Sequence, residues 1–225
     1  MKLLAIDSAT EACSVALNID GELTEIYQLA KNQHSVLLLD MVQNLLDSKR
    51  LQITDLDVIA YDQGPGSFTG IRIGAGVAQG LALSADLRVI GISSLQAMAL
   101  CCPDGWVLPA IDARMRQVYW GFMRKSGDNQ EIVIEESVAN PLDVTDSVQQ
   151  IMREGDGKII AVGTGWDSYH ELTSQLSSSS ISRLPDFDYP RASSVAQLAQ
   201  KYFCDHDMTE IAPAMPKYVR NKVTN

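Results

Sequence analysis

The chain has 225 residues, of which 46% are hydrophobic and 20% are charged, and this composition excludes a disordered chain or a fibrous protein. Its 28 acidic residues outnumber 18 basic ones and give a formal net charge of −10, which argues against a protein that grips RNA on its own. No apolar run approaches the roughly 20 residues that cross a bilayer, and the first residues do not resemble a signal peptide, so we expect a cytoplasmic protein.

The first half of the sequence predicts three strands followed by alternating helices and strands. Apolar residues at 3–6 and an alternating apolar pattern at 13–19 flank a polar turn, and an Asp20-Gly21 turn leads into a third strand at 22–29. A helix is expected over 34–50, a strand over 58–61 and a second helix over 67–84. A strand over 89–92 and a helix beginning at Ser93 or Ser94 complete an α/β unit.

The same order of elements returns in the second half of the sequence. Strands are expected at 108–112, from 118 onward and at 131–138, followed by a helix at 142–153, a buried strand at 158–162 and a helix after Gly165. The spacing from Asp7 to Asp112 is also the spacing from Cys13 to Val118, so the register continues beyond the repeated Ala-Ile-Asp. We therefore predict two tandem β-β-β-α-β-α halves, residues 1–103 and 104–225.

The last third of the second half is less regular. The serine run at 177–180 is expected to be a connecting loop. The final helix, over 192–203, has an amphipathic pattern that suits packing against either half. The tail at 213–220 contains two prolines and is expected to be extended.

A glycine-rich segment after the strand at 58–61 is the most distinctive motif. It leads into a helix whose free N–H groups and positive dipole end suit an anion, although it lacks the Lys of a P-loop and the spacing of a dinucleotide fingerprint. The turn after the first strand adds a carboxylate and hydroxyl groups, which hold metals or orient water in phosphate-handling folds. The candidate nucleotide or anion loop consists of Asp7, Ser8, Thr10, Gly64, Gly66 and Ser67. The alternative at Asp7 is a carboxylate that only caps a turn, and at Asp112 we prefer that alternative.

Four further glycines, Gly70, Gly74, Gly76 and Gly80, fall in the helix that follows this loop. Each costs a helix roughly 1 kcal/mol relative to alanine, so we expect them to allow another element to approach closely. Arg72 lies among apolar residues of the same helix, and we expect it to need a carboxylate partner inside the fold or across an interface.

The helix over 34–50 has more apolar residues than one packing face requires. A helix that lies on a sheet normally needs a single apolar stripe, whereas this one has two. One explanation is complete burial within its own fold; we prefer a second surface for a partner. Together with Arg72, the candidate partner-binding residues are His34, Leu37, Leu38, Met41 and Leu45.

Neither a nucleophile motif nor a metal-binding motif is evident. There is no G-x-S-x-G segment, and His34 has no second histidine at a ligand spacing. The four cysteines show no CxxC pair and are expected to be reduced and to act as small hydrophobic residues: Cys13, Cys101, Cys102 and Cys204. We therefore expect no metal and no cofactor of its own.

The chain resembles the TsaB (YeaZ) family of the bacterial tRNA threonylcarbamoyladenosine biosynthesis machinery over nearly its whole length. The resemblance is carried by LAIDSATEACSVA at 4–16, His34-Ser35, GPGSFTGIRIG at 64–74, AIDAR at 110–114 and PKYVR at 216–220. It implies an actin-like and Hsp70-like ATPase fold, related to ribonuclease H, in two halves. This implied fold matches the internal repeat.

The resemblance also implies a role as an accessory subunit. Its paralogue TsaD is thought to transfer the threonylcarbamoyl group to adenosine 37 in ANN-decoding tRNAs, with a metal held by His-x-x-x-His on the equivalent early helix, where this chain has His34 and Leu38. TsaB is expected to bind TsaD through helices of the first half, to form homodimers when alone, and to admit the ATPase TsaE to the complex. ATP or ADP would then bind at the partner interface, and tRNA only through the partners. The alternative is an actin-like enzyme that binds or hydrolyses nucleotide with Asp7 and the loop at 64–67.

Overall fold

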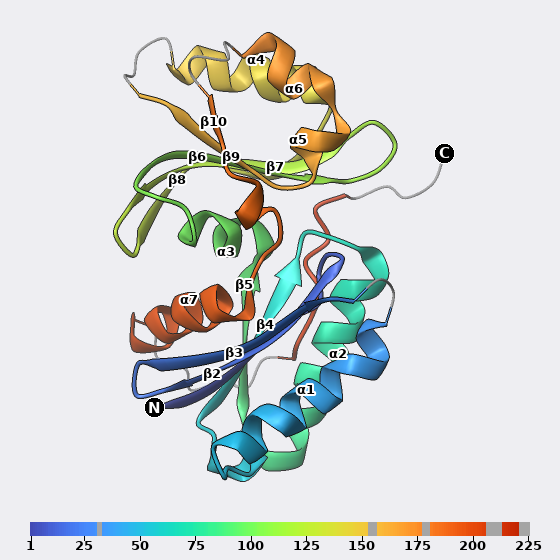
Figure 1. Cartoon of the computed structure of the whole chain (residues 1–225), viewed down its shortest axis with the longest axis vertical. Helices are drawn as coiled ribbons and strands as arrows, with labels where there is room; N and C mark the ends of the chain where they lie inside the picture. Colours follow the sequence, from blue (N-terminus) through green and yellow to red (C-terminus); the bar gives the residue numbers. More distant parts are fainter. Residues whose placement is uncertain (31–32, 153–156, 177–180, 206–212, 221–225) are drawn as a thin grey trace. The chain divides into compact units, whose positions relative to one another are not determined.

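The computed structural model describes residues 1–30, 33–152, 157–176, 181–205 and 213–220. The chain forms two compact units, Met1–Ala97 with Pro190–Lys217 and Met98–Tyr189 with Tyr218–Asn225. The division proposed from the sequence has a single break after residue 103, whereas the chain passes from one unit to the other three times. Each unit contains its own sheet (Figure 1).

A five-stranded mixed sheet with the order β3-β2-β1-β4-β5 organises the first unit. Its strands are β1 (Lys2–Asp7), β2 (Ala12–Ile19), β3 (Glu22–Leu29), β4 (Val58–Gly64) and β5 (Arg88–Ser93). The first three strands pair antiparallel through the two predicted turns, which are confirmed. Strand β4 pairs parallel to β1, and β5 pairs parallel to β4.

Helices cover both faces of this first sheet. The helices α1 (His34–Ser48) and α2 (Phe68–Ala85) lie side by side on one face, with a 3-10 turn, Ile53–Asp55, near them (Figure 1). The opposite face packs against α7 (Ala192–Asp205), which comes from the end of the chain. Hydrogen bonds tie α7 to the sheet, because the Ser14 hydroxyl accepts from Ala192 N at 2.8 Å and Asn18 Nδ2 donates to Gln200 Oε1 at 2.7 Å.

The second unit repeats the plan of the first. Its strands are β6 (Gly105–Asp112), β7 (Val118–Ser126), β8 (Asn129–Ala139), β9 (Ile159–Val162) and β10 (Ile181–Arg183), in the order β10-β9-β6-β7-β8. Its helices are α4 (Pro141–Met152), α5 (Gly165–Ser168) and α6 (His170–Gln175), and a 3-10 turn spans Pro185–Phe187. The helix α3 (Ser94–Leu100) follows β5 and contains the first point at which the chain passes between the units. Because the two strand orders correspond one to one, the predicted duplicated α/β architecture is confirmed.

Two features of the second unit were not predicted. The strand β10 is only three residues long and half-buried, so it lacks the apolar run that marks β9. The helix expected after Gly165 is divided into α5 and α6 at Tyr169, whose backbone is extended.

The serine run at 177–180 lies outside the described residues. The tail at 213–220 forms neither helix nor strand.

Candidate functional site

The hairpin turn that follows β1 is built around the buried carboxylate of Asp7. This side chain has no solvent exposure, and its Oδ1 accepts from Ala9 N at 3.0 Å while its Oδ2 accepts from the Ser14 hydroxyl at 3.4 Å. Asp62 at the end of β4 is also buried, and its Oδ1 accepts from Gly64 N at 2.8 Å and from the Ser94 hydroxyl at 2.5 Å. Burial, and then the neighbouring Asp62 carboxylate, raise the pKa of Asp7 well above its usual value.

The loop at 64–67 packs directly against this turn. Ser67 N donates to Ala9 O at 2.7 Å, and the Ser8 hydroxyl donates to Gly70 O at 3.0 Å. A Cβ added at Gly66 would lie 2.2 Å from Ala9 O, and one added at Gly70 would lie 2.1 Å from Ser8 O. The glycines therefore admit carbonyl oxygens of the chain itself, which would repel an anion.

This packing changes the interpretation of the candidate nucleotide or anion loop. The structure does bring Asp7, Ser8 and Thr10 together with the glycine loop, but their side chains bond to backbone groups of the chain: to Ala9 N, Gly70 O and Ala12 N, respectively. Ser67 is the N-cap of α2, and its hydroxyl accepts from Gly70 N at 3.3 Å. In this conformation Ser67 N, an amide that could hold a phosphate, already donates to Ala9 O, and the nucleotide or anion loop stays a prediction.

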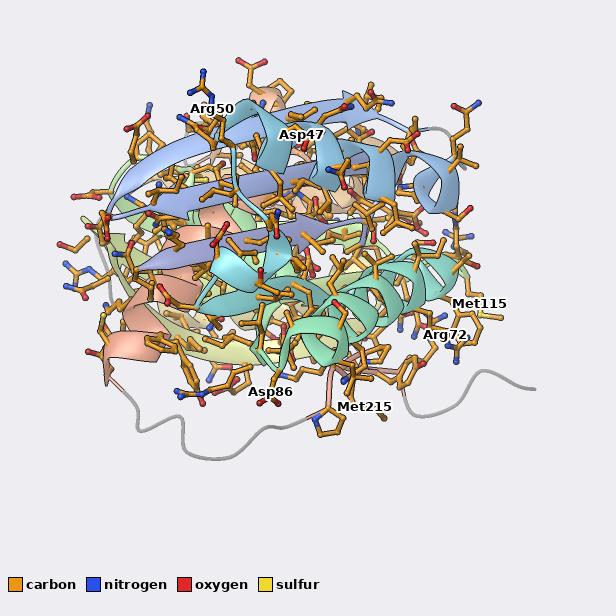
Figure 2. The ribbon with its side chains drawn as sticks, turned by 90° about the horizontal axis from the view of Figure 1, so that it is seen from below. Asp47, Arg50, Arg72, Asp86, Met115 and Met215 are labelled. Carbon is orange, nitrogen blue, oxygen red and sulfur yellow. The ribbon has the colours of Figure 1, made fainter. Side chains whose placement is uncertain are left out.

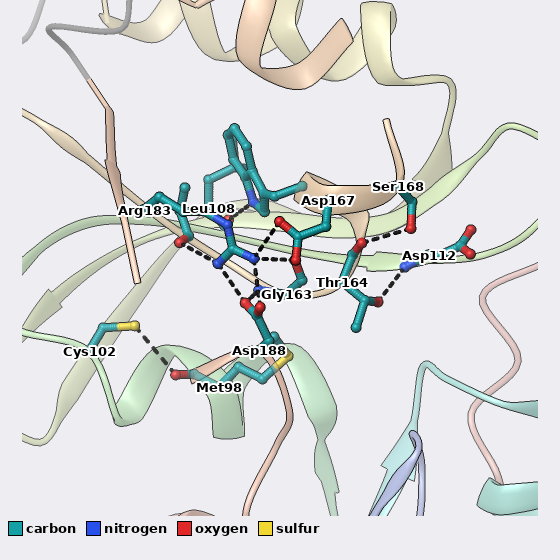
Figure 3. A network of polar contacts seen from close by, with 12 residues as sticks. Met98, Cys102, Leu108, Asp112, Gly163, Thr164, Asp167, Ser168, Arg183 and Asp188 are labelled. Atoms are coloured by element: carbon teal, nitrogen blue, oxygen red, sulfur yellow. Dashed lines mark hydrogen bonds and ion pairs between the residues drawn. The ribbon is translucent and has the colours of Figure 1, made fainter. Parts of the chain in front are cut away.

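The second unit contains a counterpart of this loop that sequence reasoning missed. A Cβ at Gly163, which follows β9, would lie 2.2 Å from Ala110 O in β6. Figure 3 shows how the loop is held: the Asp188 carboxylate accepts from Gly163 N at 2.7 Å and from both terminal nitrogens of Arg183 at 2.5 and 2.6 Å. The signal was present in the Gly-Thr-Gly sequence at 163–165, which follows a buried strand as Gly-Pro-Gly does in the first half.

Asp112 occupies the position of Asp7 in the second unit and has a turn-capping role. Its Oδ1 accepts from Arg114 N at 2.8 Å and from the Tyr169 hydroxyl at 2.7 Å. Its N donates to the Thr164 hydroxyl at 3.1 Å, the contact that Figure 3 shows. The preferred interpretation of Asp112 as a turn cap is thus confirmed.

The buried Asp7 predicts how the stability of the fold depends on pH. Because the folded pKa is raised, Asp7 contributes its full stability below the unfolded value of about 3.8 and loses it as the pH rises through the folded pKa. Asp7→Asn removes this titration, so the stability of the native chain relative to the variant should decrease from about pH 4 to pH 7. Urea unfolding across this range measures the difference. Exposed Asp86→Asn is the control, and parallel pH profiles for the native chain and Asp7→Asn would contradict the assignment.

The predicted partner surface on α1 needs a correction. His34, Leu38, Met41 and Leu45 are buried in the core of the first unit, together with Val42 and Leu46, because α1 packs against the sheet and α2 at once. The expectation of exposed side chains at these four positions is therefore wrong, and the alternative of burial within the fold accounts for them. Leu37 is half-buried, and the large apolar side chains that α1 does expose are Val36 at 68% and Leu39 at 52%.

The helix α2 presents a more distinctive outer surface than α1. Residues on one i,i+4 row, from Phe68 through Arg72, Gly76 and Gly80, are exposed, and Leu83 beside the end of this row is 73% exposed. A Cβ at Gly76 or Gly80 would meet no atom within 4 Å. These two glycines leave the helix backbone open to a neighbour from outside the chain.

Arg72 does not have the environment expected from the sequence. Its side chain is exposed, and its guanidinium carbon lies 3.2 Å from the centroid of the Phe68 ring, one turn earlier in α2. Arg72 is therefore not a charge buried inside the fold, and a carboxylate partner across an interface stays a prediction. The pair instead adds an aromatic ring and a cation to the exposed side of α2, and both residue types are enriched at protein interfaces.

We define the α1–α2 face as the exposed and half-exposed residues on the outer side of these two helices. It consists of Val36, Leu37 and Leu39 from α1 and Phe68, Arg72, Gly76, Gly80 and Leu83 from α2. The helices lie side by side in both views (Figures 1 and 2), so their outer sides form one surface. This surface, and not the buried side of α1, is the candidate site.

Two kinds of site are absent from the part of the chain that the structure describes. None of its helices combines the length and apolar character that a membrane crossing requires. Within the same ranges, no group of three or more His, Cys, Asp and Glu side chains is placed to hold a metal ion.

Comparisons with known proteins agree with this architecture. The family model for the tRNA N6-adenosine threonylcarbamoyltransferase TsaD matches residues 26–224. The tRNA threonylcarbamoyladenosine biosynthesis protein TsaB of Escherichia coli is 39% identical, with 99% of this chain and 96% of the relative covered. The protein of the same description from Haemophilus influenzae is 36% identical, with 100% and 95% covered. The solved structure of YeaZ from Pseudomonas aeruginosa superposes with a TM-score of 0.83 at 32% identity, covering 96% of this chain and 99% of that one.

Proposed function

Because this chain belongs to the TsaB (YeaZ) family of tRNA threonylcarbamoyladenosine biosynthesis proteins, we propose that it is a non-catalytic subunit that activates a TsaD-type threonylcarbamoyltransferase. In this role the chain docks on the transferase and stabilises its productive form. The observation that carries the proposal is the α1–α2 face, where two adjacent helices expose apolar side chains, an aromatic ring and two bare glycines.

The residues of α1 support a role without metal-assisted transfer. His34 is buried, and its Nε2 lies 3.2 Å from Ala12 O, so the ring packs within the fold. The position one helical turn further is Leu38, which is buried and offers no ligand atom. A His-x-x-x-His pair of the kind expected in the paralogue therefore does not exist on this helix.

The closed glycine loop supports the same role. Ala9 O and Ser8 O approach Gly66 and Gly70 closely, and these carbonyl oxygens would repel a bound phosphate. Any ATP or ADP in the assembly would then bind where the partner contributes residues, and an ATPase of the TsaE type would join through the complex.

Charge and shape suggest which molecules this subunit meets directly. A net charge of −10 disfavours direct binding of tRNA by this chain, so its partners would bind the tRNA. The assembly would work in the cytoplasm. A TsaD-type partner shares the family domain that matches this chain, so it would bring a helix pair of its own to the α1–α2 face. In the absence of that partner, a second copy of the chain would use the same face.

Reconstitution of the modification reaction tests the proposed function. Purified TsaD-type and TsaE-type proteins are incubated with ATP, an activated threonylcarbamoyl donor and an ANN-decoding tRNA, with and without this chain. We expect modified adenosine only when this chain is present, and none when it replaces the TsaD-type protein. Full modification without this chain would contradict an activating role, and modification without the TsaD-type protein would contradict a non-catalytic one.

A further inference from the structure

The tail segment at residues 214–217 is held against the first unit by its backbone. Met215 N donates to the Tyr61 hydroxyl at 2.8 Å, and the same hydroxyl donates back to Met215 O at 3.0 Å. Lys217 N donates to Gln63 O at 2.8 Å, so the segment follows the end of β4. Four residues far from β4 in sequence are thus fixed without forming a strand.

The same segment is attached to α2 beside the α1–α2 face. Ala214 N donates to Gln79 Oε1 at 2.6 Å, and Ala214 is buried in the core cluster that contains α1 and α2. On the helix surface Gln79 is the neighbour of Gly76, three residues before it, and of Leu83, four residues after it. The tail therefore borders the exposed row of α2 on the side of Gln79.

Met215 points away from these attachments. Its backbone makes two hydrogen bonds to one hydroxyl, yet its side chain is 62% exposed, and Figure 2 shows it on the outer side next to α2. A large apolar side chain on a fixed backbone, at the border of an apolar helix surface, extends that surface at little cost in ordering entropy. The unbranched thioether of methionine also adapts well to a variable partner surface.

We propose that residues 214–217 form one wall of the surface that receives a helix of the TsaD-type partner, with Met215 in direct contact with that helix. Half-buried Ile73 and Val77 pack towards the core shared with α1, and the tail borders the other side of α2, so Gly76 and Gly80 form a floor of bare backbone between them. A helix fits such a floor because the missing side chains allow a close approach. This inference rests on the proposed function and adds the tail to the docking surface.

Binding measurements on three variants test the role of the tail. Met215→Asp places a charge at the expected contact and should weaken the affinity for the TsaD-type partner about 10-fold or more, whereas Met215→Leu should bind almost as the native chain does. Tyr61→Phe removes the hydroxyl that fixes Met215 and should weaken binding about 3-fold to 10-fold, because the freed segment must be ordered on association. Titration calorimetry with the purified partner gives the affinities, and circular dichroism checks the fold of each variant.

A chemical measurement gives an independent readout on the native chain. Oxidation of Met215 by hydrogen peroxide, followed by peptide mass spectrometry, should slow markedly in the complex because the partner covers the thioether. Native affinity of Met215→Asp, or equal oxidation rates in the free chain and the complex, would overturn the role of the tail. If Gly80→Leu still prevents association in that case, the α1–α2 face and the proposed function stand without the tail. If neither variant affects association, the docking face itself is wrong.

Discussion

Replacing Gly80 with leucine is expected to weaken association with the TsaD-type partner by about 100-fold or more. Gly80 is the last residue of the exposed row of α2, and a side chain there would hold a partner helix away from the bare backbone. Titration calorimetry or fluorescence anisotropy with the purified partner measures the change. In the reconstituted reaction the variant should also fail to support tRNA modification at concentrations at which the native chain is saturating.

The same substitution should not harm the fold. A Cβ at Gly80 would have no neighbour within 4 Å, and leucine favours a helix over glycine by about 0.8 kcal/mol, so the midpoint of urea unfolding should stay equal or rise. Gln197→Leu is the matched control, because it adds the same exposed side chain to α7 on the opposite face of the first sheet. Undiminished binding by Gly80→Leu, or equal losses in the two variants, would exclude α2 as the docking helix.

Replacing Gly70 with alanine is expected to destabilise the protein by about 3 kcal/mol. The added Cβ would lie 2.1 Å from Ser8 O and 3.3 Å from Ser8 C, so the backbone of the turn after β1 would have to move. That movement would disturb the hydrogen bonds that surround the buried Asp7. Chemical unfolding followed by circular dichroism measures the loss.

Gly80→Ala provides the comparison within the same helix. The chemical change is identical, but the site is open, so this variant should gain up to about 1 kcal/mol from helix propensity alone. A loss of stability in Gly70→Ala together with a gain in Gly80→Ala would show that the glycine loop packs tightly against the turn after β1. Equal stability of the two variants would mean that the turn and the loop can separate easily, and the nucleotide interpretation would then regain support.

The order of the elements could be predicted because each was marked by local chemistry. Strand and helix periods, the Asp20-Gly21 turn and the repeated Ala-Ile-Asp gave the duplicated plan, and Ser67 and Ser94 lie where the helices α2 and α3 begin. The strand β10 was not predicted because its three residues are all half-buried and show no alternation of apolar and polar side chains. The local sequence pattern thus predicts an element more reliably when the element is long and has one apolar and one polar face.

The site could be predicted only in part, because a single sequence does not say what covers a surface. The two apolar sides of α1 form one wide arc that is buried against both the sheet and α2, so Leu38 and Met41 gave a false partner surface. Gly66 and Gly76 look alike in the sequence, yet one admits a carbonyl oxygen of the same chain and the other has nothing within 4 Å. The bonds between Tyr61 and Met215 join segments that no local pattern connects.

The origin of α7 has a consequence for synthesis of the chain on the ribosome. This helix covers the side of the first sheet formed by residues such as Leu3, Val58 and Ile90, but it is encoded at residues 192–205, after the entire second sheet. While the polypeptide is still emerging, that apolar side lacks the cover of α7. Completion of the amino-terminal core must therefore wait until the codons for residues 192–205 have been translated, and a nascent chain stalled before them would be a natural substrate for chaperones.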